Sequence, residues 1–209
     1  MINIFNYFVK ITAYPVYLLL VNNKKICQDN DKSLTKIKGP AIIISNHTNL
    51  FDYVIWLFTF FNRTIRFQMA EVLFTKKPLC YLLRALGGIE VNRKTFDFSF
   101  MNKSLAILRN NGVVGIFPES RLPLPNEKRP LPFTSTAAKL ALESQVQVIP
   151  VYTDGRYFEK KRPVSVIGKP INVMDYYDDK LSEKENISNI TTIMYNKIVE
   201  LEAIAYEKG

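Results

Sequence analysis

The chain has 209 residues, of which 47% are hydrophobic and 22% charged, and its formal net charge is +9 at pH 7. This length and composition suit one domain with a sizeable core. Two cysteines, Cys27 and Cys80, are too few for a disulfide framework or a zinc site, which predicts a reducing compartment. A single histidine excludes a histidine-rich metal site, and the lack of G-x-G-x-x-G and Walker-type loops argues against nucleotide chemistry.

The net charge is compatible with two classes of partner. A basic protein can bind nucleic acid, but aromatic residues such as Phe58, Phe60 and Phe61 lie within apolar stretches, unlike stacking platforms. An anionic lipid surface and a phosphorylated substrate explain a basic, apolar-rich chain at least as well. We therefore expect membrane lipids as partners and no nucleic acid.

The first 25 residues are a candidate membrane-associating segment. They are mostly apolar or aromatic but contain Lys10 and Pro15, and they lack the basic start and the cleavage site of a signal peptide. About 18 apolar residues could barely cross a bilayer of ~30 Å, and Lys10 near their middle would be costly. We expect an interfacial helix or helical hairpin; the alternative is a helix packed on the protein's own core. We expect residues 26–209 to form the folded domain that follows this segment.

Strands and helices alternate along the rest of the chain. Hydrophobic periodicity and turn residues predict the order of elements. The expected strands are 41–44, 65–69, 113–117, 146–152 and 164–167, and the expected helices are 51–61, 78–86, 98–110, 135–143 and a C-terminal amphipathic helix over 187–205. This alternation predicts an α/β fold with a largely parallel twisted sheet flanked by helices.

His47 is the only histidine, and Asp52 follows it by five residues. The pair lies between the predicted strand 41–44 and a helix for which Asn49 is a candidate cap. Asp52 would lie in the first helical turn, where the helix dipole favours its ionised form. It could then orient His47 and stabilise the imidazolium formed when His47 takes a proton. The alternative is a turn histidine that only makes hydrogen bonds.

Three more blocks follow in order: Gly87 to Arg93, Phe117 to Arg121, and an apolar strand ending in Pro150. With Asn46-His47 to Asp52, they resemble the four ordered blocks of the glycerolipid acyltransferase family, typified by 1-acyl-glycerol-3-phosphate acyltransferases. The resemblance covers roughly residues 35–170. Each block is weak alone, but four in order with ordinary spacing make chance a poor explanation.

Three positions depart from the family pattern. Ser120 stands where the family usually has glycine, Thr136 falls about where many relatives have glycine, and Ala70 replaces a lysine that is frequent in the family. Because glycine permits positive φ and serine tolerates it poorly, we expect the backbone around Ser120 to differ. None of these positions is His47 or Asp52, so we expect an active enzyme.

The resemblance implies an O-acyltransferase that moves a fatty acyl group from acyl-CoA or acyl carrier protein to a lysophospholipid hydroxyl. The first choice of acceptor is 1-acyl-glycerol-3-phosphate, giving phosphatidic acid. His47 would be the base and Asp52 its orienting partner. Arg93 and Arg121, delivered by neighbouring strands, would clamp the acceptor phosphate, unless either only makes a surface ion pair. Glu119 would anchor the loop or an acceptor hydroxyl.

The same resemblance implies no metal and no cofactor beyond the thioester co-substrate, with acyl carrier protein as a candidate partner. We expect the protein at the cytoplasmic face of the cell membrane. Two alternatives stay open: the same chemistry on glycerol-3-phosphate or a lyso-aminolipid, and a non-catalytic peripheral lipid-binding protein.

Overall fold

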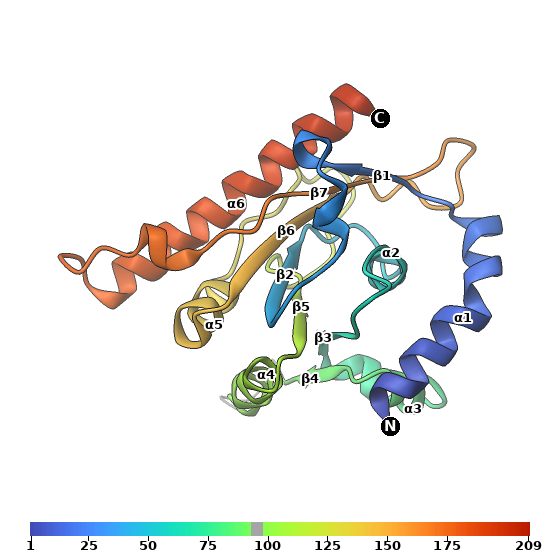
Figure 1. Ribbon diagram of the computed structural model, residues 1–209, viewed down its shortest axis with the longest axis horizontal. Coiled ribbons are helices and arrows are strands. Elements are labelled where there is room, and N and C mark those ends of the chain that lie inside the picture. The colour runs from blue at the N-terminus through green and yellow to red at the C-terminus, as the bar shows by residue number, and fades with distance from the viewer. Residues whose placement is uncertain (93–97) are drawn as a thin grey trace.

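The computed structural model describes residues 1–92 and 98–209 (Figure 1). Its strands are β1 (Lys24–Cys27), β2 (Ala41–Ser45), β3 (Ile65–Ala70), β4 (Ile89–Val91), β5 (Val113–Ile116), β6 (Gln147–Thr153) and β7 (Val164–Ile167). They form a seven-stranded sheet in the order β1-β7-β6-β2-β5-β3-β4. All of its described pairings are parallel except β6–β7, so the predicted largely parallel sheet is confirmed.

Helices cover both faces of this sheet (Figure 1). The α-helices are α1 (Ile2–Leu20), α2 (Asp52–Thr59), α3 (Leu79–Ala85), α4 (Ser99–Arg109), α5 (Thr136–Ser144) and α6 (Glu183–Lys208). Short 3-10 turns are η1 (Gln28–Asn30), η2 (Lys32–Thr35), η3 (Glu71–Phe74) and η4 (Val173–Tyr176). Every helix and strand predicted after residue 40 is present, whereas β1 and the 3-10 turns are too short to give a periodic signal.

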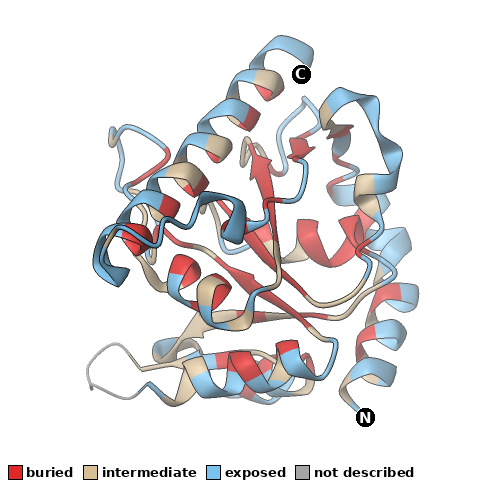
Figure 2. Ribbon diagram, turned by 60° about the vertical axis from the view of Figure 1, so that its left-hand side comes forward, coloured by how far each residue is buried: buried red, intermediate tan, exposed pale blue. Residues whose placement is uncertain are grey.

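The central strands are buried on both faces, as Figure 2 shows in red. In β2, Ile42 and Ile44 pack in the cluster that contains α4, α5 and α6, while Ile43 packs in the cluster of α1 and α2. Successive side chains of a strand point to opposite faces. A continuous apolar run is therefore what a parallel strand between two helical layers requires.

The position of β2 determines where the site lies. It pairs in parallel with β5 on one side and β6 on the other. Because parallel strands end at the same edge of a sheet, the segments that follow β2, β5 and β6 meet there. These segments begin at residues 46, 117 and 154.

The N-terminal segment is one helix, α1, with Pro15 inside it, and not a helical hairpin. Its buried side carries polar residues, among them Asn6 and Lys10. Lys10 Nζ donates to three carbonyls at the end of α2, those of residues 60, 61 and 63, at 3.1, 3.1 and 2.7 Å. No helix in the described part of the chain has the length and apolar character needed to span a bilayer. The predicted boundary after residue 25 falls within β1.

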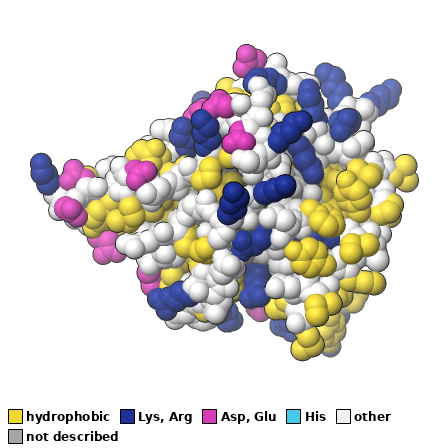
Figure 3. All heavy atoms as spheres, viewed as in Figure 1, with side chains coloured by type: hydrophobic (Ala, Val, Ile, Leu, Met, Phe, Trp, Pro, Cys, Tyr) yellow, Lys and Arg dark blue, Asp and Glu magenta, His cyan; other side chains and the backbone are white. Residues whose placement is uncertain are grey.

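The outward side of α1 is apolar. Ile4, Phe8, Ile11 and Leu19 are exposed and recur at helical spacing. In Figure 3, hydrophobic side chains gather on the side of the molecule where α1 lies. The helix therefore buries two polar side chains, Asn6 and Lys10, together with apolar ones that pack on the core, while most of its large apolar side chains face outward.

Candidate active site

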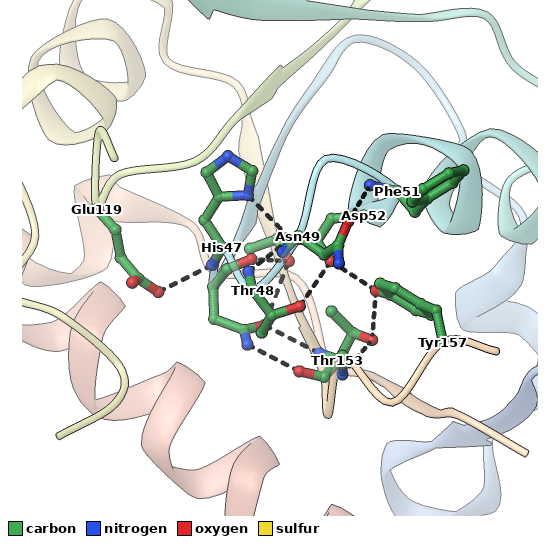
Figure 4. Close-up of polar contacts among 11 residues, drawn as sticks. His47, Thr48, Asn49, Phe51, Asp52, Glu119, Thr153 and Tyr157 are labelled. Atoms are coloured by element: carbon green, nitrogen blue, oxygen red, sulfur yellow. Dashed lines mark hydrogen bonds and ion pairs between the residues drawn. The ribbon is translucent and has the colours of Figure 1, made fainter. Parts of the chain in front are cut away.

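His47 and Asp52 meet at the end of β2, as the sequence predicted (Figure 4). His47 Nδ1 lies 2.9 Å from Asp52 Oδ2. An ionised carboxylate only accepts, so Nδ1 carries the proton in this hydrogen bond. The helix begins at Asp52, with Phe51 as its N-cap, and not at Asn49. Asn49 Oδ1 instead accepts from the Phe51 amide at 3.1 Å and closes the preceding turn.

Asp52 is fully buried, and its carboxylate accepts five hydrogen bonds. Besides His47, the donors to Oδ2 are the amides of Thr48 and Asn49, at 2.6 and 3.0 Å. Oδ1 accepts from the Thr48 hydroxyl at 2.8 Å and from the Tyr157 hydroxyl at 2.6 Å. A buried carboxylate is tolerated only when it is paired and hydrogen-bonded in this way. These contacts fix its orientation toward the imidazole.

Tyr157 is a site residue that the sequence reasoning missed. Burial, followed by the charge of Asp52, raises the pKa of Tyr157, so its hydroxyl stays protonated and donates to the carboxylate. Its oxygen lies 2.9 Å from the Thr153 hydroxyl, which must then be the donor in that contact. The only available signal was its place shortly after the fourth block; the pairing of β6 beside β2 is what brings it to Asp52.

The backbone and ring of His47 are held by the neighbouring strands. Its ring stacks on Phe117, with centroids 4.3 Å apart and an angle of 19° between the planes. Its amide donates to Glu119 Oε1 at 2.9 Å. The preceding Asn46 side chain bonds both the carbonyl and the amide of Thr153, at 2.8 and 2.9 Å. The loop that carries His47 is therefore tied to both β5 and β6.

Glu119 is only 5% exposed. Burial raises the pKa of this carboxyl, and its bond to the His47 amide partly opposes that effect. Its buried Oε2 has no well-formed hydrogen bond among the described residues, although the backbone amide of Leu131 also favours the charged form. The observed contact is with the loop that carries His47, one of the two expected roles.

Arg121 is exposed and already paired. Its guanidinium forms two parallel bonds with Glu127, at 2.7 and 2.8 Å, which is the surface ion pair considered as an alternative. Arg93 lies outside the described residues. The expectation that neighbouring strands deliver both arginines is wrong, because β3 lies between β4 and β5.

A cavity of about 430 Å³ opens beside the imidazole. His47, Ser120 and Arg121 line its polar side. The rest of its wall is mostly apolar and includes Leu50, Tyr53, Met69, Ala70, Val72, Leu73, Leu79, Leu83, Phe117 and Leu122. Ala70, one of the three departures from the family pattern noted in the sequence, contributes to this apolar wall. A larger groove of about 780 Å³, between α4, α5 and α6, includes neither His47 nor Asp52.

Ser120 adopts the left-handed conformation, with φ of 60°. Serine here takes the positive φ that a glycine would permit. Its hydroxyl lies 3.4 Å from the Pro118 carbonyl and 3.2 Å from the Thr134 hydroxyl. Local hydrogen bonds of this kind help a short polar side chain to tolerate positive φ.

Comparison with known proteins agrees with this fold. The acyltransferase family model matches residues 21–154. This is more than half of the chain, which therefore belongs to the acyltransferase family and is an enzyme, an O-acyltransferase.

The individual relatives share low sequence identity with this chain. The chain is similar to 1-acyl-sn-glycerol-3-phosphate acyltransferase of Borreliella burgdorferi, with 28% identity over 185 residues, 84% of this chain and 71% of the relative. The Bacillus subtilis protein of that name is 23% identical over 195 residues, 91% and 94% of the two chains. The crystal structure of the 1-acyl-sn-glycerophosphate (LPA) acyltransferase PlsC from Thermotoga maritima has the same fold, with a TM-score of 0.64 and 20% identity over 88% of this chain and 74% of that one.

Proposed function

We propose that the enzyme transfers a fatty acyl group from a thioester, acyl-CoA or acyl carrier protein, to the free hydroxyl of a lysophospholipid. The acceptor is 1-acyl-glycerol-3-phosphate and the product phosphatidic acid. The observation that carries this proposal is a His47–Asp52 pair opening onto an apolar cavity with an arginine on its wall. The names of the two sequence relatives support the choice of acceptor.

The proposed chemistry needs one base. Since Nδ1 of His47 is bonded to Asp52, the other ring nitrogen, Nε2, is free to take a proton, and Figure 4 shows it directed away from Asp52. His47 deprotonates the acceptor hydroxyl, whose oxygen attacks the thioester carbonyl carbon. The tetrahedral intermediate collapses as the carbon–sulfur bond breaks, and the imidazolium returns its proton to the thiolate. Asp52 stabilises the imidazolium in between.

The substrate groups match the walls of the cavity. Its apolar side suits an acyl chain, since removing apolar surface from water is favourable. Its polar side carries Arg121, whose planar fork suits a phosphate as well as the carboxylate of Glu127. An exposed ion pair contributes roughly 0–1 kcal/mol. A dianionic phosphate can therefore replace Glu127 at little cost.

The proposed lipid substrates also imply that the enzyme works at a membrane. The outward apolar side of α1 and the net charge of +9 favour an anionic lipid surface. We propose a peripheral protein at the cytoplasmic face of the cell membrane, held there in part by α1. Such a position gives direct access to a lysophospholipid that resides in the bilayer.

A thiol-release assay tests the activity. Palmitoyl-CoA, or palmitoyl-acyl carrier protein, is supplied with lysophosphatidic acid, with glycerol-3-phosphate, or with no acceptor. Release only with lysophosphatidic acid supports the proposal. Release only with another acceptor would keep the chemistry and change the substrate, and no release with any acceptor would favour a non-catalytic lipid-binding protein.

Substitution of Arg121 tests the phosphate contact. Arg121→Ala should lower kcat/KM for lysophosphatidic acid ten- to a hundred-fold, since a charge-assisted bond contributes roughly 1.5–3 kcal/mol. Arg121→Lys should recover only part of this loss, because an ammonium lacks the bidentate fork. Monoacylglycerol, which has no phosphate, is the control acceptor. Equal losses with both acceptors would show that Arg121 supports the loop through Glu127.

A further inference from the structure

Three exposed apolar side chains gather beside the active site. Leu50, Phe51 and Phe158 are 61%, 44% and 54% exposed. Leu50 and Phe51 lie in the loop that carries His47, and Phe158 lies between β6 and β7. The rings of Phe51 and Phe158 meet edge to face, with centroids 4.9 Å apart. We call these three residues, two of which are aromatic, the aromatic tip.

The backbone at Phe158 is strained and directs this side chain outward. Its φ is 64°, a left-handed conformation that is a genuine outlier for a bulky residue. The neighbouring Tyr157 is buried against Asp52, so consecutive aromatic side chains point one inward and one outward. No core packing repays the strain at an exposed phenylalanine, which makes the position a candidate for function.

Positive charge surrounds the tip. Residues 154–162 contain four basic and two acidic side chains, a net charge of +2. Asp154 pairs with Arg156 within the loop. Lys160 and Lys161 are exposed and make no ion pair in the described part of the chain. Apolar side chains flanked by lysines are typical of segments that contact anionic lipid.

The tip lies at the mouth of the catalytic cavity. Leu50 is mostly exposed, yet it also lines the cavity that contains His47. The loop between β6 and β7 is tied to the end of α1, because Arg162 donates to the carbonyl and side-chain oxygen of Asn22, at 2.6 and 3.1 Å. Figure 1 shows this loop near the C-terminal end of α1. The aromatic tip and the outward side of α1 thus belong to neighbouring parts of the molecule.

We propose that the aromatic tip inserts into an anionic bilayer as a membrane contact separate from α1. Phe158 enters the apolar region, while Lys160 and Lys161 contact the acidic headgroups. This contact holds the mouth of the cavity at the lipid surface, so that a lipid acceptor reaches His47 without crossing water. The purpose of the contact rests on the proposed function, but its existence is tested without measuring catalysis.

Fluorescence quenching reports insertion directly. Full-length Phe158→Trp protein is mixed with vesicles of phosphatidylcholine and phosphatidylglycerol that contain brominated lipid. Its emission should be quenched and shifted to the blue after subtraction of the wild-type signal from the buried Trp56. Tyr176→Trp, at an exposed position in η4, is the matched control and should stay unquenched.

Vesicle sedimentation with matched variants measures the contribution of the tip. Phe158→Ser should weaken partitioning about ten-fold, and Lys160→Gln and Lys161→Gln about five-fold each at low salt. Tyr176→Ser and the double variant Lys180→Gln/Lys184→Gln remove similar groups from exposed positions outside the tip and its basic loop, and they should change partitioning little. Far-ultraviolet circular dichroism confirms that each variant is folded.

The outcomes separate the two proposals. Quenching at position 158 supports the tip contact even if no acceptor gives thiol release, in which case only the proposed function fails. A tryptophan at 158 that is not quenched overturns the contact, whether the protein binds the vesicles through α1 alone or not at all. Concentration-dependent dimerisation that Phe158→Ser abolishes would assign the tip to a second copy of the chain and also overturn it.

Discussion

Two buried carboxylates at the site, those of Asp52 and Glu119, differ in how many hydrogen bonds they accept. Asp52 accepts five hydrogen bonds, from His47, two backbone amides and two hydroxyls. Glu119 holds the His47 amide with Oε1, while Oε2 lacks a well-formed bond and burial raises the pKa of the group. Because polar groups left unpaired in a dry environment are costly, Asp52 is the more firmly fixed of the two.

Replacement of His47 tests the base. His47→Ala should lower turnover by at least about 100-fold, the usual scale of general-base catalysis, while the fold is retained because the imidazole is partly exposed. Asp52→Asn should be equally impaired and also less stable, because its NH₂ group would face backbone donors. Steady-state kinetics and thermal unfolding separate these effects. Near-normal turnover of His47→Ala would contradict the proposed mechanism.

Tyr157→Phe tests whether the tyrosine positions Asp52. The variant loses one of the five hydrogen bonds to the carboxylate, and we expect kcat to fall about ten-fold with KM little changed. Stability should fall by roughly 0.5–1.5 kcal/mol, since the ring stays buried. Tyr152→Phe is the control: this buried tyrosine also loses one hydrogen bond, to Glu202 on α6, but does not line the catalytic cavity. Equal effects of the two substitutions would deny Tyr157 a specific role.

At the scale of elements, α1 and α2 are joined by one buried cation. The last carbonyls of a helix have no partner within it and carry partial negative charge. Lys10 supplies the donors for three carbonyls just beyond α2. A lysine that would be costly in the middle of a membrane span is thus stabilising at the turn after α2, and it helps to hold α1 against that helix.

Lys10→Met should destabilise the protein by roughly 1–3 kcal/mol, because buried carbonyls lose their donor. Burial lowers the pKa of Lys10 to about 8, against 10.5 in an exposed lysine. Between about pH 8 and 9.5 the unfolded chain therefore binds more protons at this residue than the folded protein. The wild-type free energy of unfolding should rise with pH in that window relative to Lys10→Met, by at most about 1.4 kcal/mol per unit. Denaturant titrations at several pH values measure this difference, and parallel curves would contradict it.

At the scale of the whole molecule, charge and apolar surface act together. The net charge is +9, and the exposed side of α1 is apolar. Coulombic attraction to anionic lipid is screened over about 8–10 Å at physiological salt, whereas apolar insertion is not. The two contributions should therefore separate by their dependence on ionic strength.

Vesicle binding should weaken as salt rises but not disappear. With α1 intact, a residual salt-resistant affinity is expected from its apolar side, and Phe8→Ser/Ile11→Ser should remove most of it without unfolding the domain, since both side chains are exposed. Sedimentation across a salt series, with neutral vesicles as the control, measures both parts. Binding that salt abolishes completely in the wild type would deny α1 a role in insertion.

Much of the fold was predictable because its signals are local. Periodicity predicts the helices α2 to α6 and the strands β2, β3, β5, β6 and β7, and a separation of five positions predicts the pairing of His47 with Asp52. The four ordered blocks likewise lie in short segments. These features depend on residues that are neighbours in the sequence, where spacing determines which side chains can meet.

Strand order, by contrast, depends on contacts between distant segments, which local patterns do not encode. Only the tertiary structure places β3 between β4 and β5 and brings Tyr157 to a carboxylate 105 residues away. It also decides which side of α1 faces inward: a helical pattern shows that two sides exist, but the carbonyls that accept from Lys10 lie in the turn after α2, and they hold the side that carries Lys10 against the core.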